Sequence, residues 1–165
     1  GVPFTSLRNG WYTENYTAQL GQYLDSGVIL GAAGHGRISA ATRQDYADAA
    51  VAALLQDTSG NRAYELGGPS FDLYELAHII SEVTGTKVAY RDLPVDAYAR
   101  ELRRAGLDEA SAGFVAALDA SLARGDLETG SRDLEHLIGH APTGPAEVVR
   151  QAYEQVDTTP TRPAG

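Results

Sequence analysis

The sequence predicts an α/β protein in which helices are in the majority, and three observations carry this prediction. Short runs of β-forming residues alternate with helical stripes in the first half, and helical stripes dominate the second half. Apolar residues make up 43% of the 165 residues, enough to bury the core of one domain. The net charge of −9 disfavours binding to nucleic acid and to anionic membranes.

The first two predicted elements are a strand and a helix, because a continuous apolar run is followed by apolar residues at helical spacing. An apolar run at 2–7 predicts a buried strand. A helix is expected to begin at Thr13 or Glu14 and to end at Gly27, which suits a left-handed C-terminal position. One face of this helix carries Tyr16, Leu20, Tyr23 and Leu24.

A hairpin or a pair of strands is predicted next, because β-rich runs at 28–30 and 37–42 flank a glycine-rich turn. Thr42 or Gln44 begins the following helix, and Asp45 is favourable near its positive end. The apolar stripe of this helix consists of Tyr46, Ala49, Ala50, Ala53 and Leu54.

A turn at 58–61 and a strand at 62–66 lead into a capped helix. Asp72 and Glu75 have the spacing of a capping box, and Gly85 is expected to end the helix. The stripe that faces the core is predicted to be Leu73, Leu76, Ala77, Ile80 and Val83.

The last expected strand, at 87–93, is followed by four helices that begin near Pro94, at Asp108, at Ser131 and at Pro145. The residues expected to face inward are Val95, Tyr98, Ala99 and Leu102; Phe114, Val115, Leu118 and Leu122; Leu134, Leu137 and Ile138; and Val149, Tyr153 and Val156.

Most polar clusters have a structural interpretation. The glycine-rich residues 31–36 could cradle a phosphate only if a helix followed, and the next residues are β-branched, so a turn is the better interpretation. His136 and His140 are four residues apart, but a metal site needs three or four ligands, and we expect no metal. The chain has no cysteine, and its single lysine, Lys87, has no tyrosine four residues before it.

The segment "SLRNGWYTENY" is the strongest candidate for a binding site. It follows the first strand, and ligands of open α/β sheets bind beyond the carboxyl ends of the strands. Asn9 can pair with an amide, and Gly10 admits a close backbone approach. Trp11 and Tyr12 can stack on a flat ring, and Asn15 lies about one helical turn later. Spacing alone leaves this site and an ordinary turn with a core tryptophan equally open.

The run "LRNGWYTENY" followed by "GVILGAAGHGRISAATRQDYADAA" resembles the C-terminal half of the NmrA-like atypical short-chain dehydrogenases, and within them the bacterial NAD(P)H:quinone oxidoreductases. The later "YELGG", "LYELAHIISEVTG" and "LEHLIGHAPTGPAEVV" fit the same family in the same order, over residues 2–156. The resemblance implies the substrate-side portion of a Rossmann-like NAD(P)-binding fold whose N-terminal dinucleotide-binding half is missing. Residues expected near the nicotinamide and the quinone are Asn9, Gly10, Trp11, Tyr12 and Asn15, with Arg8 either a cleft residue or an ion-pair anchor.

The function that the resemblance implies is hydride transfer from a nicotinamide cofactor, NADPH in the intact parent, to a quinone-like small molecule. It assigns no catalytic residue. Two alternatives stay open, because fold does not settle function. One is a non-enzymatic dinucleotide-sensing regulator that binds a protein partner. The other is an extended short-chain dehydrogenase or epimerase that acts on a nucleotide-sugar.

The chain is expected to be a piece of a longer protein, since it contains no methionine and opens directly on a buried-strand pattern. Residues 1–157 should form its folded part and 158–165 a disordered tail. Alone, it should be inactive and bind NADPH weakly. Its partner would be the missing N-terminal half, and a homodimer of the parent stays open. A cytoplasmic location fits the lack of cysteine and of a signal-peptide pattern.

Overall fold

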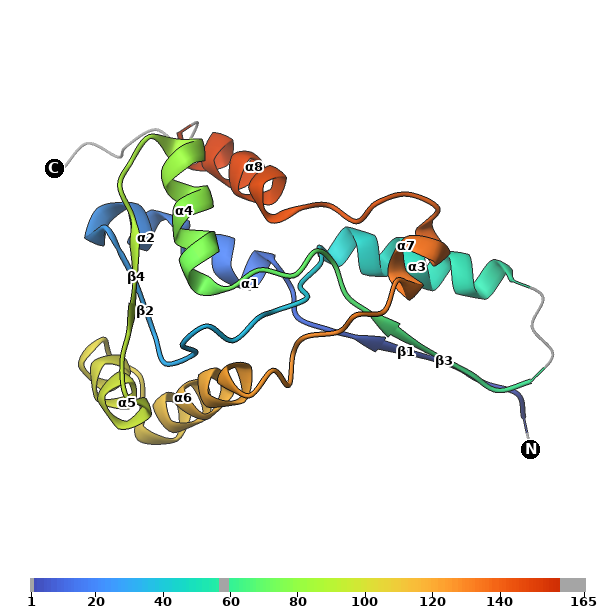
Figure 1. The fold of residues 1–165 in the computed structure, drawn as a ribbon, viewed down its shortest axis with the longest axis horizontal. Coiled ribbons are helices and arrows are strands. Elements are labelled where there is room, and N and C mark those ends of the chain that lie inside the picture. The colour runs from blue at the N-terminus through green and yellow to red at the C-terminus, as the bar shows by residue number, and fades with distance from the viewer. Residues whose placement is uncertain (1, 57–59, 158–165) are drawn as a thin grey trace, which may run out of the picture.

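The computed structural model describes residues 2–56 and 60–157, and it confirms an α/β fold with helices in the majority (Figure 1). In these residues the strands are β1 (Thr5–Asn9), β2 (Val28–Gly31), β3 (Arg62–Leu66) and β4 (Ala89–Asp92). The helices are α1 (Glu14–Thr17), α2 (Leu20–Ser26), α3 (Arg43–Leu55), α4 (Leu73–Thr84), α5 (Val95–Arg104), α6 (Glu109–Ala123), α7 (Asp133–Ile138) and α8 (Pro145–Asp157). None of these helices is long and apolar enough to cross a bilayer. The expected tail at 158–165, and part of the expected turn at 58–61, lie outside the described residues.

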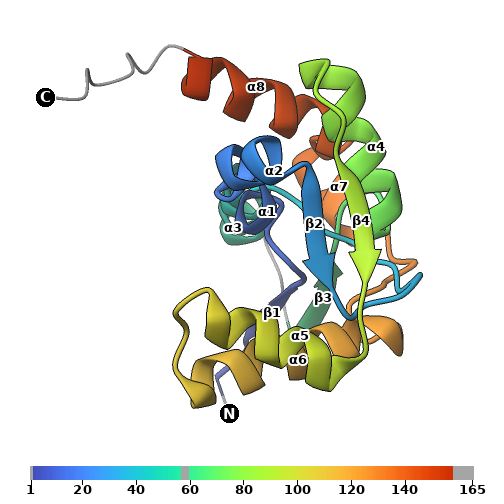
Figure 2. The ribbon, with the colours of Figure 1, turned by 90° about the vertical axis from the view of Figure 1, so that its left-hand side faces the viewer.

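The four strands form two separate parallel pairs. β1 pairs with β3, beginning with Thr5 opposite Arg62, and α3 and α7 pack beside this pair. β2 pairs with β4, beginning with Val28 opposite Ala89, and α4 packs on it. The carboxyl ends of β2 and β4 point toward α5 and α6 (Figure 2). The two pairs therefore lie in different parts of the molecule, with α1 and the loop after β2 between them (Figure 1).

The hairpin predicted from the runs at 28–30 and 37–42 is wrong. β2 takes its hydrogen bonds from β4, a parallel partner that follows α4 in the chain. Residues 37–42 form no strand, and Ile38 and Ala41 make only isolated bridges. A parallel partner requires a long crossover, so the local sequence around the glycine-rich turn could not reveal it.

The helix predicted from residue 13 to Gly27 is divided into α1 and α2. The Gln19 N–H donates to the carbonyl of Tyr16, three residues back, at 3.0 Å. The Gln19 side chain donates to the carbonyl of Asn15 at 3.2 Å, the acceptor that a continuous helix would give to the Gln19 backbone. This tight turn separates the two helices, and Gly27 ends α2 in the left-handed conformation, as predicted.

Capping boxes start both α3 and α4; the sequence indicated the box at Asp72 but left the start of α3 open between Thr42 and Gln44. At α3, the Thr42 side chain accepts the Asp45 N–H, and the Asp45 side chain accepts the Thr42 N–H. Asp45 is buried and also accepts hydrogen bonds from the backbone N–H and hydroxyl of Thr143, at 3.0 and 3.2 Å. The carboxylate therefore ties the start of α3 to the segment that precedes α8.

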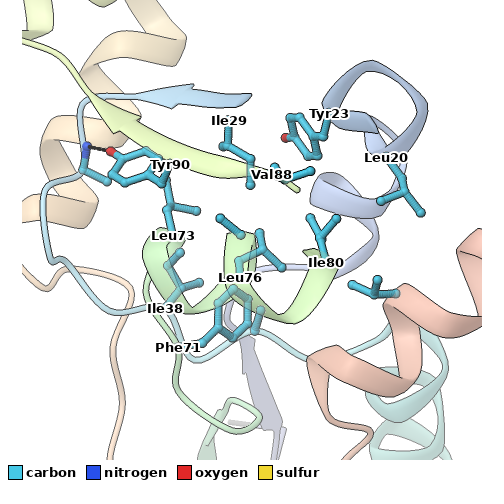
Figure 3. Close-up of a cluster of buried hydrophobic side chains, with 14 of the residues drawn as sticks. Leu20, Tyr23, Ile29, Ile38, Phe71, Leu73, Leu76, Ile80, Val88 and Tyr90 are labelled. Carbon is cyan, nitrogen blue, oxygen red and sulfur yellow. Dashed lines mark hydrogen bonds between the residues drawn. The ribbon is translucent and has the colours of Figure 1, made fainter. Parts of the chain in front are cut away.

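Two groups of apolar side chains fill the interior. The main core lies between the β2–β4 pair and helices α2, α4 and α8 (Figure 3). Its labelled members are Leu20, Tyr23, Ile29, Ile38, Phe71, Leu73, Leu76, Ile80, Val88 and Tyr90. The second core lies among α3, β3 and α7 and consists of Ala41, Tyr46, Ala49, Leu66, Leu134 and Leu137.

The inward face is wrongly predicted in part of four helices. Leu54, assigned to the stripe of α3, is 85% exposed, and Phe114, assigned to the stripe of α6, is 70% exposed. Val95 of α5 and Val156 of α8, also assigned inward, are 39% and 46% exposed. The face that α6 buries contains Ala112, Ala116 and Asp119 instead. Small residues let α6 approach its neighbours closely, which apolar periodicity alone does not indicate. This rotation places Asp119 inside the molecule.

Candidate functional site

The carboxyl end of β1 is fixed by contacts to two neighbouring segments. The Gly10 N–H donates to the carbonyl of Leu66 in β3 at 2.8 Å, and the Ala41 N–H donates to the carbonyl of Trp11 at 3.0 Å. A Cβ on Gly10 would lie 3.1 Å from the carbonyl oxygens of both Leu66 and Ser39. This tight fit favours glycine and sets where the residues after β1 lie.

Trp11 and Tyr12 leave this backbone toward different cores. Trp11 packs against the main core, whereas Tyr12 packs against the second core. The Tyr12 ring meets Tyr46 edge-on, with 5.4 Å between ring centroids, and the Arg43 guanidinium carbon lies 5.1 Å from the Tyr12 centroid. The two aromatic residues therefore do not form one stacking surface for a flat ligand.

A cleft of about 670 Å³ opens beside Trp11. Its walls come from α1, α2, β2, α5 and α6. The lining side chains on which the site depends are Trp11, Asn15, Tyr16, Tyr23, Tyr98 and Asp119. The volume suits a small ligand, and the aromatic lining with a few polar groups is typical of ligand pockets.

Asp119 is the buried acid of this cleft, with 8% of the residue exposed. Its Oδ2 accepts a hydrogen bond from the Ala32 N–H at 2.7 Å. Burial raises the pKa of Asp119 to about 6; the Ala32 N–H opposes this shift, and the charge of Asp92 adds to it. At neutral pH the cleft therefore contains a carboxylate that is mainly ionised and poorly hydrated.

Three tyrosines line the same cleft as this carboxylate. Burial, together with the charge of Asp119, raises the pKa of Tyr16, Tyr23 and Tyr98 above the usual range, so their hydroxyls stay neutral. In the part of the chain that the structure describes, these hydroxyls have no hydrogen-bond partner, and the buried indole Nε1 of Trp11 has none either. The hydroxyls are therefore free to bond to a ligand or to water in the cleft.

The glycine-rich turn at 31–36 uses its amides within the chain. The N–H groups of residues 32–34 donate in turn to Asp119, Tyr90 and Asp92, at 2.7, 3.0 and 2.8 Å; the bond to Tyr90 is drawn in Figure 3. No helix follows the turn, so it is not a phosphate-binding loop. Across residues 2–56 and 60–157, no group of three or more histidines and acids is placed to hold a metal ion.

Of the six residues predicted for the cleft, Trp11 and Asn15 are the two that line it in the described chain. Arg8 and Asn9 are exposed on β1, and Arg8 pairs with Glu65 at 2.5 Å, which matches the ion-pair alternative. Of the remaining two, Gly10 packs against the backbone at the end of β1, and Tyr12 packs in the second core.

Sequence reasoning missed Asp119 and the cleft that it shares with the three tyrosines. The tyrosines lie on predicted core-facing stripes, which indicates that they are buried but does not indicate an open space between the helices. One sequence signal could have indicated that Asp119 is buried. It lies three residues from both Ala116 and Leu122, so it shares a helix face with these two buried residues. An aspartate on an apolar face is unusual, since acids are rarely buried without a partner.

Comparison with known proteins places the chain beside a group of reductases. No family model matches. Quinone oxidoreductase 2 of Escherichia coli is 39% identical over 154 residues, which cover 93% of this chain and 54% of the relative. Its NADPH-bound crystal structure has a TM-score of 0.88, with 38% identity, and the match covers 93% of this chain and 54% of that one.

Two further relatives are also a reductase and an oxidoreductase by name. Triphenylmethane reductase of Citrobacter sp., solved with NADP(H), is 33% identical with a TM-score of 0.85, and the match covers 92% of this chain and 54% of that one. An NmrA-like oxidoreductase of Aspergillus flavus is 30% identical, with 92% of this chain and 50% of the relative covered. The chain thus spans about half the length of the curated relatives it matches.

Proposed function

Because this chain belongs to the NmrA-like group of atypical short-chain dehydrogenases and spans about half the length of its relatives, we propose that it is the substrate-side half of an NAD(P)H-dependent oxidoreductase. The proposed hydride acceptor is a quinone-like molecule and the proposed cofactor is NADPH. The name of the E. coli relative and the NADPH in its structure support both parts. A cytoplasmic location is part of the proposal.

The observation that carries the proposal is the cleft beside the carboxyl end of β1. Ligands of open α/β folds bind beyond the carboxyl ends of parallel strands, and Trp11 lies two residues after β1. The cleft is lined by Trp11 and by three tyrosines whose hydroxyls have no hydrogen-bond partner in the described residues, and its volume suits a small ring system. This arrangement can bind and orient an acceptor while its apolar lining excludes water.

The described chain fits only the nicotinamide end of a dinucleotide. The amides of residues 32–34 are already occupied by side chains, so the pyrophosphate would require another segment. The side-chain amide of Asn15, which lines the cleft, suits the carboxamide of the ring. When bound, the cofactor would supply the hydride, and Asn15 would help to hold its ring.

The proposal also gives the chain a place for a dinucleotide-binding half. In the described residues β1 has β3 on one side and no strand on the other. Leu54 and Leu55, the last residues of α3, are 85% and 82% exposed, and α3 packs beside β1 (Figure 1). An open strand edge beside exposed apolar residues is a surface that another segment can cover.

The chain alone is expected to bind NADPH more weakly than micromolar, because the amides of its glycine-rich turn are not free. Isothermal titration calorimetry with the 165-residue chain tests this. Micromolar binding would contradict the division of the cofactor site between this chain and another segment.

In a protein that joins this chain to a dinucleotide-binding half, Trp11→Phe is expected to raise the KM for benzoquinone about tenfold with little change in kcat. The variant loses part of the ring that lines the cleft, and in the proposal this ring contacts the acceptor equally in the ground and transition states. The loss of NADPH absorbance measures the rate. Tyr12→Phe is the matched control, because Tyr12 packs in the second core, away from the cleft.

An equal KM for the Trp11 and Tyr12 variants would remove Trp11 from the acceptor site. If the joined protein bound NADPH but did not oxidise it with benzoquinone, the regulator alternative would be favoured instead.

A further inference from the structure

One carboxylate oxygen of Asp119 is free to contact a ligand in the cleft beside Trp11. The Oδ2 atom accepts the Ala32 N–H at 2.7 Å, and a Cβ on Gly31 would lie 2.7 Å from it, so this oxygen packs against the loop after β2. The Oδ1 atom has no hydrogen-bond partner in residues 2–56 and 60–157, yet it is not fully enclosed. Because Asp119 lines the cleft, Oδ1 is the oxygen that a bound molecule can meet.

Asp119 differs from the other charged side chains of the cleft. Glu101 and Arg104 also line it, but they pair with each other at 2.6 Å. In the described residues, no lysine, arginine or histidine pairs with Asp119, whose one hydrogen bond comes from the backbone. The carboxyl group can therefore exchange a proton with a ligand without breaking an ion pair.

The proposed reaction needs such a proton. When the C–H bond of a dihydronicotinamide breaks, the hydrogen and both bonding electrons pass to the quinone, which becomes a hydroquinone monoanion. This anion must gain a proton to become the neutral hydroquinone. Since a bound acceptor and the apolar lining exclude water, a group in the wall of the cleft is the most direct source of this proton.

Asp119 matches this task better than the three tyrosines of the cleft, Tyr16, Tyr23 and Tyr98. Burial raises the pKa of Asp119 to about 6, whereas a phenol such as a hydroquinone has a pKa of about 10. A proton therefore moves from the carboxyl group to the phenolate with a favourable free energy. Burial raises the pKa of each of the three tyrosines above the usual range, so a proton transfer from any of them would be unfavourable.

We propose that Asp119 is the proton donor in quinone reduction and that its Oδ1 atom delivers the proton. This inference rests on the proposed function. As the acceptor gains the hydride, the O–H bond at Oδ1 breaks and a new O–H bond forms on the reduced acceptor. The products are a neutral hydroquinone and the Asp119 carboxylate, which regains a proton from water after the hydroquinone leaves. The Ala32 N–H holds Oδ2 and thereby orients the carboxyl group.

The rate of quinone reduction is therefore expected to fall as pH rises. Only the protonated carboxyl group can donate, and its pKa is about 6. In a protein that joins this chain to a dinucleotide-binding half, kcat/KM for benzoquinone at saturating NADPH should fall about tenfold for each pH unit above this pKa. The loss of NADPH absorbance between pH 5 and 8 measures it, after subtraction of the uncatalysed reaction.

The other groups near Asp119 do not produce this dependence. Those that face it or share its cleft are the three tyrosines, Tyr90, Asp92, and the paired Glu101 and Arg104. Burial raises the pKa of all four tyrosines above the usual range, so they stay neutral between pH 5 and 8. The charge of Asp92 adds to the raised pKa of Asp119.

Two variants separate proton donation from a structural role. In Asp119→Asn the amide oxygen can still accept the Ala32 N–H, but no acidic proton remains. This variant should lower kcat about 100-fold at pH 6 with little change in KM, and its remaining rate should not vary with pH. Asp92→Asn should keep the pH dependence but move it to lower pH, because Asp92 does not line the cleft and its charge helps to raise the pKa of Asp119.

Quinone binding gives a second measurement that does not require turnover. A protonated Asp119 can donate a hydrogen bond to a quinone carbonyl, whereas the ionised carboxylate repels that oxygen. Duroquinone should therefore bind the 165-residue chain about tenfold more tightly at pH 5 than at pH 8. Trp11 is the sole tryptophan and lines the cleft, so quenching of its fluorescence reports binding. Asp119→Asn should remove the difference between the two pH values.

Three results would overturn the inference while leaving the proposed function in place. The joined protein could reduce benzoquinone at a rate that does not vary with pH, or Asp119→Asn could keep the pH dependence of the unmodified protein. Duroquinone could also bind equally at both pH values. If the joined protein reduced no quinone at any pH, the proposed function itself would fail, and the proton transfer with it.

Discussion

Gly36→Ala is expected to lower the free energy of unfolding by about 3 kcal/mol or more. A Cβ at this position would lie 2.1 Å from the carbonyl oxygen of Leu122, 2.5 Å from its carbonyl carbon and 2.8 Å from the Cα of Ala123. All three atoms belong to the backbone at the end of α6, which no side-chain rotation can move aside. The variant must push α6 away from the turn or unfold.

Denaturant unfolding at constant temperature measures this effect, and Gly113→Ala is the matched control. Gly113 lies within α6, where a Cβ would meet no atom within 4 Å. The control should gain about 0.5 to 1 kcal/mol, because alanine is the better helix former. If Gly36→Ala changed stability no more than the control does, the close packing of the turn on α6 would be wrong.

This packing explains why the role of Gly36 could not be predicted from the sequence. Residues 31–36 contain three glycines, and the sequence excludes a phosphate loop because no helix follows them. Sequence alone gives no reason for the third glycine. In the fold, Gly36 lets the turn contact α6, which brings Asp119 within 2.7 Å of the Ala32 N–H. The contact joins segments far apart in the chain, so only the tertiary structure reveals it.

Local signals predicted helix boundaries well and strand pairing poorly. The box at Asp72 and the left-handed glycines at 27 and 85 lie where the sequence places them, because caps depend on neighbouring residues. The partner of β2 could not be predicted in this way. It lies beyond a helix and another strand, and parallel pairing leaves no turn signal.

The candidate site was predictable only in part. The strand end led to Trp11 and Asn15, which line the cleft, while their contact with a ligand stays a prediction. The sequence could not show that Trp11 and Tyr12 enter different cores, because that depends on the path fixed by Gly10. Asp119 was missed because acids are normally assigned to the solvent face of a helix.

The contribution of Asp119 to stability is expected to fall by roughly 2 to 3 kcal/mol as pH rises from about 4 to 7. Burial raises the pKa of Asp119 to about 6 in the folded chain, whereas an unfolded aspartate titrates near its usual value of about 3.9. Between these two values the folded state binds a proton that the unfolded state has lost. Stability from this group therefore decreases as pH rises, and it is constant once both states are ionised.

The groups that face Asp119 do not reverse the direction in which its contribution to stability changes with pH. Its charged and titratable neighbours are Tyr16, Tyr23, Tyr98, Tyr90 and Asp92, from α1, α2, α5 and β4. Burial raises the pKa of each of these four tyrosines above the usual range, so they stay neutral across this interval. The Asp92 carboxylate repels that of Asp119, which reinforces the effect.

Unfolding of the unmodified chain and of Asp119→Asn, measured across this pH range, isolates the group, because the other acids contribute equally to both. Asp119→Asn should become more stable relative to the unmodified chain as pH rises. Asp126→Asn is the opposite control, because hydrogen bonds from Ser121 and Arg124 lower the pKa of Asp126. The free energy of unfolding of the unmodified chain should therefore increase relative to that of Asp126→Asn as pH rises. A difference for Asp119→Asn that did not vary with pH, or that varied as in Asp126→Asn, would show that the Asp119 carboxylate is hydrated and that the cleft holds no buried charge.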